Sequence, residues 1–82
     1  MSFYVYILYS DKLNKYYTGQ TNDLEDRLYR HNAGQEKFTS KGVPWKLLWS
    51  KALETRVAAV TLEHQIKKRG AKRYLLDIAA EG

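Results

Sequence analysis

One segment, residues 16–31 with the sequence YYTGQTNDLEDRLYRH, limits the possible folds of this chain more than any other part. Within it a strand pattern passes directly into a helix pattern. We expect the strand to turn at Gly19 and a helix to follow over residues 23–33. Asn22 is a good N-cap for that helix, and Glu25, three residues later, completes a capping-box-like pair. The chain should therefore combine strands and helices in one small fold.

The helix expected over residues 23–33 carries polar residues on the face that should be buried. Positions 24, 27, 28 and 31 follow the i, i+3, i+4, i+7 spacing of a core-facing stripe. Two of these positions are leucines, but the other two are Arg27 and His31. An unpaired buried charge is costly. We therefore expect other polar groups of the protein to meet this stripe.

The composition restricts the class of protein. A chain of 82 residues should form one domain, residues 1–82, that buries about 60–65% of its unfolded surface. A hydrophobic fraction of 44%, with seven Tyr, two Phe and two Trp, is typical of globular proteins. The absence of cysteine excludes disulfides, thiolate zinc sites and catalytic thiols, and two histidines are too few for a histidine zinc cluster. No hydrophobic run approaches ~18 residues and no signal peptide is recognisable, so we expect a cytoplasmic protein without a membrane partner.

The net charge of +5, from 14 Lys and Arg against 9 Asp and Glu, suits a polyanionic partner such as nucleic acid. The charge is concentrated over residues 67–73, where five of the seven residues are basic. These five are Lys67, Lys68, Arg69, Lys72 and Arg73. The alternative interpretation is a solvated helix end, where cations also interact favourably with the helix dipole.

The remaining patterns predict a small three-stranded sheet flanked by helices, an α/β fold with the element order ββαβαα. The run of β-branched and aromatic residues from 3 to 9 is apolar on both alternating faces, so it should be a central strand covered on two sides. A polar turn then leads into the return strand of a hairpin. The expected strands cover residues 3–9, 16–19 and 45–51, and the expected helices cover residues 23–33, 56–69 and 71–79.

Smaller signals mark the ends and faces of these elements. Thr55 should cap the second helix, and Gly34 and Gly70 should end the first and second helices. In the third strand, alternation should place Trp45 and Trp49 on the same face. These signals leave an 11-residue polar loop between the first helix and the third strand. It is either a functional loop or merely a long connection.

The second helix repeats the anomaly of the first, because Glu63 occupies a slot in its apolar stripe. Two interpretations follow from the residues alone. Glu63 could form an internal salt bridge with Arg27, and the domain would then be an interaction module with a structural ion pair. Alternatively, Glu63, Arg27 and His31 could converge near the tyrosines of the hairpin as an active site.

These residues resemble the pattern of the GIY-YIG nuclease superfamily. Residues 4–6, YVY, stand where its first triplet belongs, and residues 17–19, YTG, match the second. The superfamily has an arginine in the following helix, a histidine or tyrosine one turn later, and a metal-binding glutamate on the second long helix. Arg27, His31 and Glu63 fit these positions. The resemblance covers essentially the whole chain, including residues 38–41 and 65–67, and is greatest to small stand-alone bacterial members.

Two positions differ from the superfamily pattern. Tyr4 replaces the glycine of the first triplet, which leaves the functional group of Tyr6 in place. Several members also carry an asparagine shortly after the metal-binding glutamate, whereas no asparagine follows Asn32 here. The alternative function, a nucleic-acid-binding module with little or no cleavage, rests on this second difference.

The resemblance implies a metal-dependent endonuclease that hydrolyses DNA phosphodiester bonds. Glu63 is a hard oxygen ligand suited to Mg²⁺ or Mn²⁺, and the planar guanidinium of Arg27 matches phosphate oxygens. A tyrosine acting as general base needs a pKa below its usual value of ~10, which cations such as Arg27 or the metal could provide. The resemblance points to Tyr6 or Tyr17 for this role, and we expect Tyr6 to be the base, with Tyr17 and His31 in its hydrogen-bond network.

The expected partner is DNA, with branched or damaged DNA as candidate substrates in repair or recombination. So short a chain has no room for a further targeting domain, so recognition should depend on DNA structure or on a partner protein. The residues expected to contact nucleic acid are Gly19, Lys41, Lys67, Lys68 and Lys72.

Overall fold

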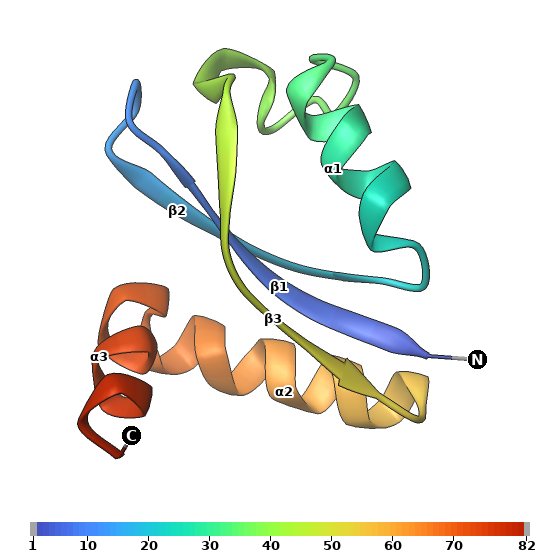
Figure 1. Cartoon of the computed structure of the whole chain (residues 1–82), viewed down its shortest axis with the longest axis vertical. Helices are drawn as coiled ribbons and strands as arrows, with labels where there is room; N and C mark the ends of the chain where they lie inside the picture. The colour runs from blue at the N-terminus through green and yellow to red at the C-terminus, as the bar shows by residue number, and fades with distance from the viewer. Residues whose placement is uncertain (1, 82) are drawn as a thin grey trace.

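The computed structural model describes residues 2–81. Within them, an antiparallel three-stranded sheet of order β2-β1-β3 is combined with helices in the predicted order ββαβαα. The strands are β1 (Phe3–Ser10), β2 (Lys15–Thr21) and β3 (Trp45–Leu53), and the helices are α1 (Leu24–Asn32), the 3₁₀ turn η1 (Ser40–Gly42), α2 (Arg56–Arg69) and α3 (Ala71–Glu81). Helix α1 covers one face of the sheet, and α2 and α3 cover the other (Figure 1). The predicted α/β class is confirmed.

Strand β1 is the centre of the fold and is buried on both of its faces. Its residues 5–8 are fully inaccessible to solvent, as predicted for a central strand. Val5 and Ile7 point toward α2 and α3, where they pack against Ala59 and Ile66. The alternate residues of β1 point toward α1 and form a second cluster. The two small cores therefore share one strand.

The second core lies between the sheet and α1. Tyr6, Leu8 and Trp45 form this cluster, and Leu24 and Leu28 of α1 pack against it. The two leucines belong to the stripe that the 3.6-residue period predicted. His31 of the same stripe is also buried, whereas Arg27 is partly exposed.

A β-bulge in β3 overturns the predicted face of one tryptophan. Ile7 pairs with Trp49 and Leu8 pairs with Leu47, so Leu48 has no partner on β1. One extra residue reverses the side-chain alternation beyond it. Trp45 consequently packs on the α1 side and Trp49 on the α2 side, and the prediction of a shared face was wrong.

Strand β2 continues through Gly19 instead of turning there. Gly19 lies opposite Tyr6 in the regular antiparallel register, and the strand ends at Thr21. The predicted turn at Gly19 was therefore wrong. The reason for a glycine at this position is found in the side chain that lies over it.

The N-cap of α1 is one residue later than the sequence indicated. The carboxylate of Asp23 accepts a hydrogen bond from the backbone N–H of Asp26 at 3.1 Å, so Asp23 is the cap and not Asn22. At α2 the predicted cap is confirmed, because the hydroxyl of Thr55 accepts from the N–H of Ala58 at 3.1 Å. Gly34 follows α1 with a φ of 76°.

In the described part of the chain, no helix is long and apolar enough to cross a bilayer.

Replacing Asp23 by Ala should destabilise the domain by about 1 kcal/mol, because the first turn of α1 loses its cap. Urea unfolding followed by circular dichroism measures this change. Asn22→Ala is the matched control and should stay within about 0.5 kcal/mol of wild type. A larger loss for Asn22→Ala than for Asp23→Ala would contradict the capping assignment.

Candidate active site

The centre of the candidate site is a buried hydrogen bond between Tyr6 of β1 and His31 of α1. The phenol oxygen of Tyr6 lies 3.0 Å from Nε2 of His31, and the two rings meet edge to face. Tyr6 is 0% exposed and His31 is 1% exposed. Two residues 25 positions apart in the sequence thus satisfy each other inside the protein.

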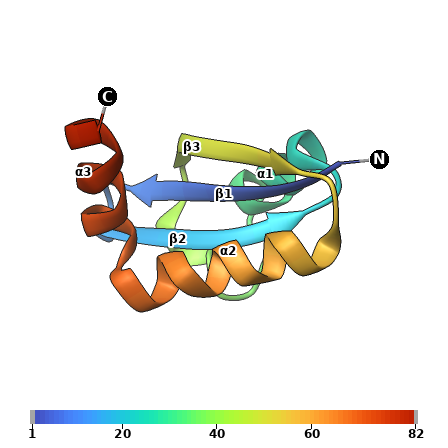
Figure 2. The same cartoon turned by 90° about the horizontal axis from the view of Figure 1, so that it is seen from below.

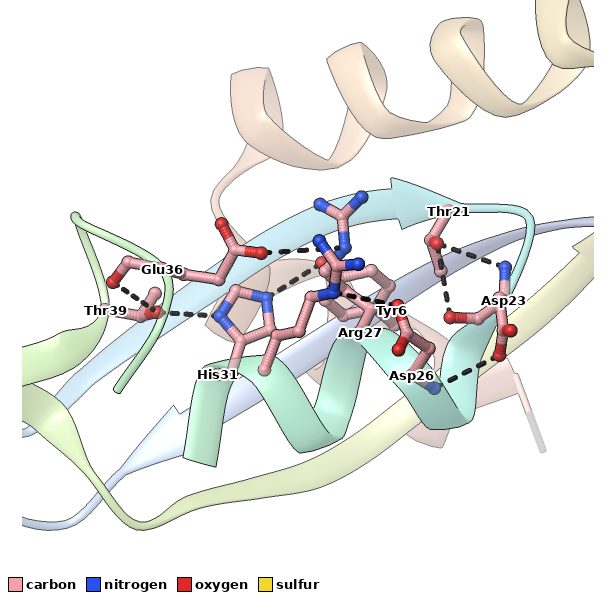
Figure 3. A network of polar contacts seen from close by, with 9 residues as sticks. Tyr6, Thr21, Asp23, Asp26, Arg27, His31, Glu36 and Thr39 are labelled. Carbon is pink, nitrogen blue, oxygen red and sulfur yellow. Dashed lines mark hydrogen bonds and ion pairs between the residues drawn. The ribbon is translucent and has the colours of Figure 1, made fainter. Parts of the chain in front are cut away.

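The second ring nitrogen of His31 is bound by a loop residue, Thr39. Nδ1 of His31 lies 2.7 Å from Oγ1 of Thr39, which is itself 1% exposed. Figure 3 shows the imidazole held between Thr39 on one side and Tyr6 on the other. The sequence analysis assigned no role to Thr39. Its signals were the length of a loop without a periodic pattern and the family resemblance over residues 38–41.

Gly19 makes room for the phenol of Tyr6. A Cβ atom built on Gly19 would lie 2.6 Å from the phenol oxygen of Tyr6 and 2.8 Å from its Cζ atom. Any larger residue would displace the Tyr6 ring from its position over Gly19, because such contacts are far below van der Waals distance. Gly19 is therefore needed to seat Tyr6, while its contact with nucleic acid stays a prediction.

Tyr17 adjoins this network through its ring. Its ring centroid is 6.4 Å from that of Tyr6 and 5.0 Å from that of His31. Among residues 2–81, nothing forms a hydrogen bond with the hydroxyl of Tyr17. Tyr17 thus encloses the site by packing and not through the hydrogen bond that the sequence analysis expected.

Arg27 lies at the rim of the site and is partly exposed. Its Nε atom is 3.9 Å from a carboxylate oxygen of Glu36, and the two side chains are 36% and 32% exposed. So long and exposed a pair contributes little to stability. Within the described residues no ion pair joins Arg27 to Glu63, so the structural salt bridge considered from the sequence is absent. The interaction-module interpretation thereby loses its basis.

Glu63 lies on α2, which packs along β2 and β1 (Figure 2). Its side chain is 14% exposed and its carboxylate lies 2.9 Å from the ammonium of Lys67, one turn further on. Burial is the main cause of the raised pKa of Tyr6, and the negative charge of Glu63 adds a smaller contribution. Among residues 2–81, no hydrogen bond or ion pair joins Glu63 to Tyr6 or His31.

Burial controls the protonation of the central pair. Burial raises the pKa of Tyr6 well above its ordinary value, and the nearby Arg27 opposes this rise only in part. Burial likewise lowers the pKa of His31 below its ordinary value of 6.5. The expectation that cations lower the pKa of Tyr6 below normal is therefore wrong for the protein alone. Both shifts favour the neutral form of the side chain at pH 7.

The donor set fits a divalent cation that takes few protein ligands. In the described part of the chain there is no group of three or more His, Cys, Asp or Glu side chains, so a closed metal cage is absent there. Mg²⁺ is commonly held by one or two carboxylates, with water and phosphate completing its shell. Glu63 offers a partly buried carboxylate paired with an exchangeable lysine. Gln20, on the face of the sheet that α2 covers, has a buried side-chain oxygen with no hydrogen-bond partner among residues 2–81.

The predicted basic residues lie on three different elements. Lys41 is exposed within η1, two residues beyond Thr39. Lys67 and Lys68 are in the last turn of α2, and Lys72 is near the start of α3. Lys67 is the one of these four that contacts a candidate site residue within residues 2–81, through its ion pair with Glu63.

A cavity of about 370 Å³ lies beside the N-terminus of α1, on the side of the sheet that carries Tyr6. Its lining residues are Tyr4, Asn22, Asp23, Leu24 and Glu25. The two carboxylates oppose the binding of a phosphate at this helix end. The cavity is therefore separate from the chemistry at Tyr6 and His31.

Comparison with known proteins decides the family. The GIY-YIG catalytic domain family matches residues 2–75. This chain belongs to the GIY-YIG family. The nuclease resemblance seen in the sequence is confirmed, and GIY-YIG domains form a family of nucleases.

Relatives of this GIY-YIG domain include UPF0213 proteins. One from Haloquadratum walsbyi is 44% identical over 66 residues, covering 78% of this chain and 72% of the relative. One from Streptococcus pyogenes is 41% identical over 68 residues, covering 80% and 72%. The solution NMR structure of a UPF0213 protein from Bacillus halodurans matches the fold with a TM-score of 0.60 at 28% identity, covering 100% of this chain and 87% of that one.

The stability of this GIY-YIG domain should fall as the pH decreases below about 6.5, because the pKa of His31 is lower in the folded than in the unfolded state. The unfolded chain then binds a proton that the folded state excludes. Arg27 acts with burial in this direction, and Glu36 opposes it. The lowered pKa of Asp77 affects only a more acidic range.

Urea unfolding at several pH values between about 7.5 and 5 measures this dependence. The His31→Gln variant should lose much of the fall in unfolding free energy over that range. His64→Gln, which alters an exposed histidine, should retain it. Equal pH dependence in wild type and His31→Gln would contradict the assignment.

Proposed function

We propose that this GIY-YIG domain is an endonuclease that hydrolyses DNA phosphodiester bonds, with Mg²⁺ or Mn²⁺ held at Glu63. The observation that carries the proposal is the buried hydrogen bond from Tyr6 to His31, 3.0 Å long, under the charge of Arg27. Buried titratable pairs with shifted pKa values are concentrated at catalytic sites. The basic net charge of the chain supports a polyanionic substrate.

The residues of the site suggest how the water molecule is activated. Tyr6 is buried in the protein alone, so the attacking water has to enter the site together with DNA and the cation. Tyr6 would then accept a proton from this water as it passes its own proton to Nε2 of His31. The two transfers are coupled, because a phenolate alone is disfavoured by burial, whereas a phenolate next to an imidazolium is a compensated ion pair. The water oxygen then bonds to phosphorus, and the bond from phosphorus to the leaving oxygen breaks.

Two other side chains help to compensate the negative charge on the phosphate. Arg27 stands at the rim with a weakly held guanidinium, whose paired N–H groups match two phosphate oxygens. A divalent cation bound at Glu63 would neutralise charge on the phosphate group. The ammonium of Lys67, displaced from Glu63, would then be available for the DNA backbone.

The basic residues support binding of a backbone polyanion. Cations in the last turn of α2 are favourable for that helix, so they have a structural explanation. Lys72 and Arg73, by contrast, lie in the first turn of α3, where the helix dipole disfavours cations. Because the helix gains nothing from these two charges, an external phosphate backbone is the better explanation for them.

Branched or damaged DNA is the proposed substrate class, with a role in repair or recombination. Phe38 is 89% exposed and precedes Thr39 in the loop that binds His31. Lys37 and Lys41 flank it on the surface. An exposed aromatic ring between cations suits an unpaired base next to its phosphates, and such bases occur at branches and lesions.

A nucleic-acid-binding module with little cleavage is the second candidate function, and one observation favours it. No asparagine follows Glu63 in this chain. Asn32 does not replace it, because its side chain accepts from the N–H of Trp45 at 2.6 Å and donates to its carbonyl at 3.2 Å. Asn32 thus has a structural task between α1 and β3.

Cleavage of nicked and branched DNA in the presence of Mg²⁺ or Mn²⁺ tests the first candidate. Glu63→Gln and Tyr6→Phe should each slow cleavage by about 100-fold or more, since each removes a cation ligand or a proton-transfer group. The matched controls are Glu54→Gln and Tyr29→Phe, which alter exposed residues away from the site and should cleave like wild type. Full activity in either site variant would contradict the proposed mechanism.

The salt dependence of DNA binding tests the basic surface and also separates the two candidates. The double variant Lys68→Gln, Lys72→Gln should reduce the slope of log affinity against log salt by about 2, because two phosphate contacts are lost. Lys12→Gln with Lys15→Gln, which alter exposed residues in the β1–β2 turn and at the start of β2, should leave the slope unchanged. Strong wild-type binding without cleavage would favour the binding module, and an unchanged slope in the first variant would exclude this surface.

A further inference from the structure

We infer that His31 carries its proton on Nδ1, with the lone pair of Nε2 facing Tyr6, and that Thr39 is a positioning residue that helps to hold this tautomer by accepting from Nδ1–H. The catalytic consequence of this arrangement rests on the proposed function. The tautomer itself is a property of the folded protein alone. It follows from where the buried protons of three side chains can go.

Three protons have to be placed in the network: one on the phenol of Tyr6, one on the imidazole of His31 and one on the hydroxyl of Thr39. All three side chains are at most 1% exposed, so water is no substitute for a missing partner. The ring has one proton because burial lowers the pKa of His31.

With the ring proton on Nδ1, every proton finds an acceptor. Nδ1–H donates to Oγ1 of Thr39 at 2.7 Å. The Thr39 hydroxyl donates to the carbonyl of Glu36, at the longer distance of 3.5 Å. The phenol of Tyr6 donates to the free lone pair of Nε2 at 3.0 Å.

With the ring proton on Nε2, one proton is left over. Nε2–H would donate to the phenol oxygen of Tyr6, and the Thr39 hydroxyl would donate to Nδ1. The phenol proton of Tyr6 would then be buried without an acceptor, since residues 2–81 provide its oxygen with no hydrogen-bond partner other than His31. A buried unsatisfied donor costs about 1–3 kcal/mol, so the first arrangement is favoured.

The backbone of Thr39 is held so that its hydroxyl stays next to Nδ1. Its carbonyl accepts from the indole N–H of Trp45 at 2.7 Å and from the N–H of Gly42 at 3.1 Å. Its own N–H donates to the carbonyl of Glu36 at 3.2 Å. Gly42 is packed against Trp45, because a Cβ atom there would come within 2.5 Å of the indole ring. The loop is therefore anchored to β3 at this point.

The tautomer determines whether His31 can accept a proton from Tyr6. A lone pair on Nε2 receives that proton directly, and the resulting imidazolium keeps its Nδ1–H bond to Thr39. A proton already on Nε2 would block the transfer. Thr39 therefore acts through His31 and touches neither water nor phosphate in this scheme.

NMR of uniformly ¹⁵N-labelled protein tests the tautomer without DNA or metal. Two-bond ¹H–¹⁵N correlation spectra at about pH 8 show which ring nitrogen of His31 carries the proton. Wild type should show Nδ1–H. Thr39→Ser, which keeps the hydroxyl, should show the same, whereas Thr39→Val should shift the population toward Nε2–H. Ser40→Ala, which removes a neighbouring exposed loop hydroxyl, is the control and should match wild type.

A wild-type spectrum with Nε2–H would overturn the inference, whether or not Thr39→Val folds. A population of the Nδ1–H form in folded Thr39→Val equal to that in wild type would overturn the positioning role of Thr39. Because these spectra need no substrate, they decide the inference even if the protein cleaves no DNA, which would refute only the proposed function. In the cleavage assay, Thr39→Val should lower kcat on the order of tenfold or more with little change in KM, and Thr39→Ser should restore it.

Discussion

The burial of the Tyr6 hydroxyl is the constraint on which the rest of this structure depends. A phenol in the middle strand of a sheet has no access to water, so it needs a partner within the protein. His31 is that partner, and Thr39 satisfies the other side of the same ring. Gly19 gives the phenol room to lie across β2. One buried hydroxyl thus links a strand, a helix and a loop from different parts of the chain.

The same burial determines the chemistry open to the site. A phenol acts as a general base by itself only where its phenolate form is stable. In this fold burial raises the pKa of Tyr6 by more than the charge of Arg27 lowers it. Burial also keeps His31 neutral, which leaves it able to take a proton. The two opposite pKa shifts favour proton sharing between Tyr6 and His31 over prior ionisation of either group. A pair that looks inert in isolation is therefore arranged for coupled proton transfer.

Several features were predictable because they depend on local spacing. The stripe of α1 was predicted from helical period alone, and its leucines and His31 do face the sheet, whereas Arg27 lies at the rim. The failures had specific physical causes. Asn22 and Asp23 are both good caps, and which one acts depends on where the preceding strand ends. The faces of Trp45 and Trp49 diverge because of a bulge, which alternation cannot reveal.

Local sequence was thus enough to establish the element order, the central strand and the family motif, since periodicity and short-range spacing set these. Packing between distant segments established which residues of the site form hydrogen bonds and ion pairs with one another. Thr39 and Glu36 sit in an irregular loop, where no period indicates which side chain points inward. Their meeting with His31 and Arg27 depends on how Trp45 anchors that loop to β3. Hydrogen bonds between such residues arise only when the folded chain brings them together, because no local sequence pattern indicates the position of either partner.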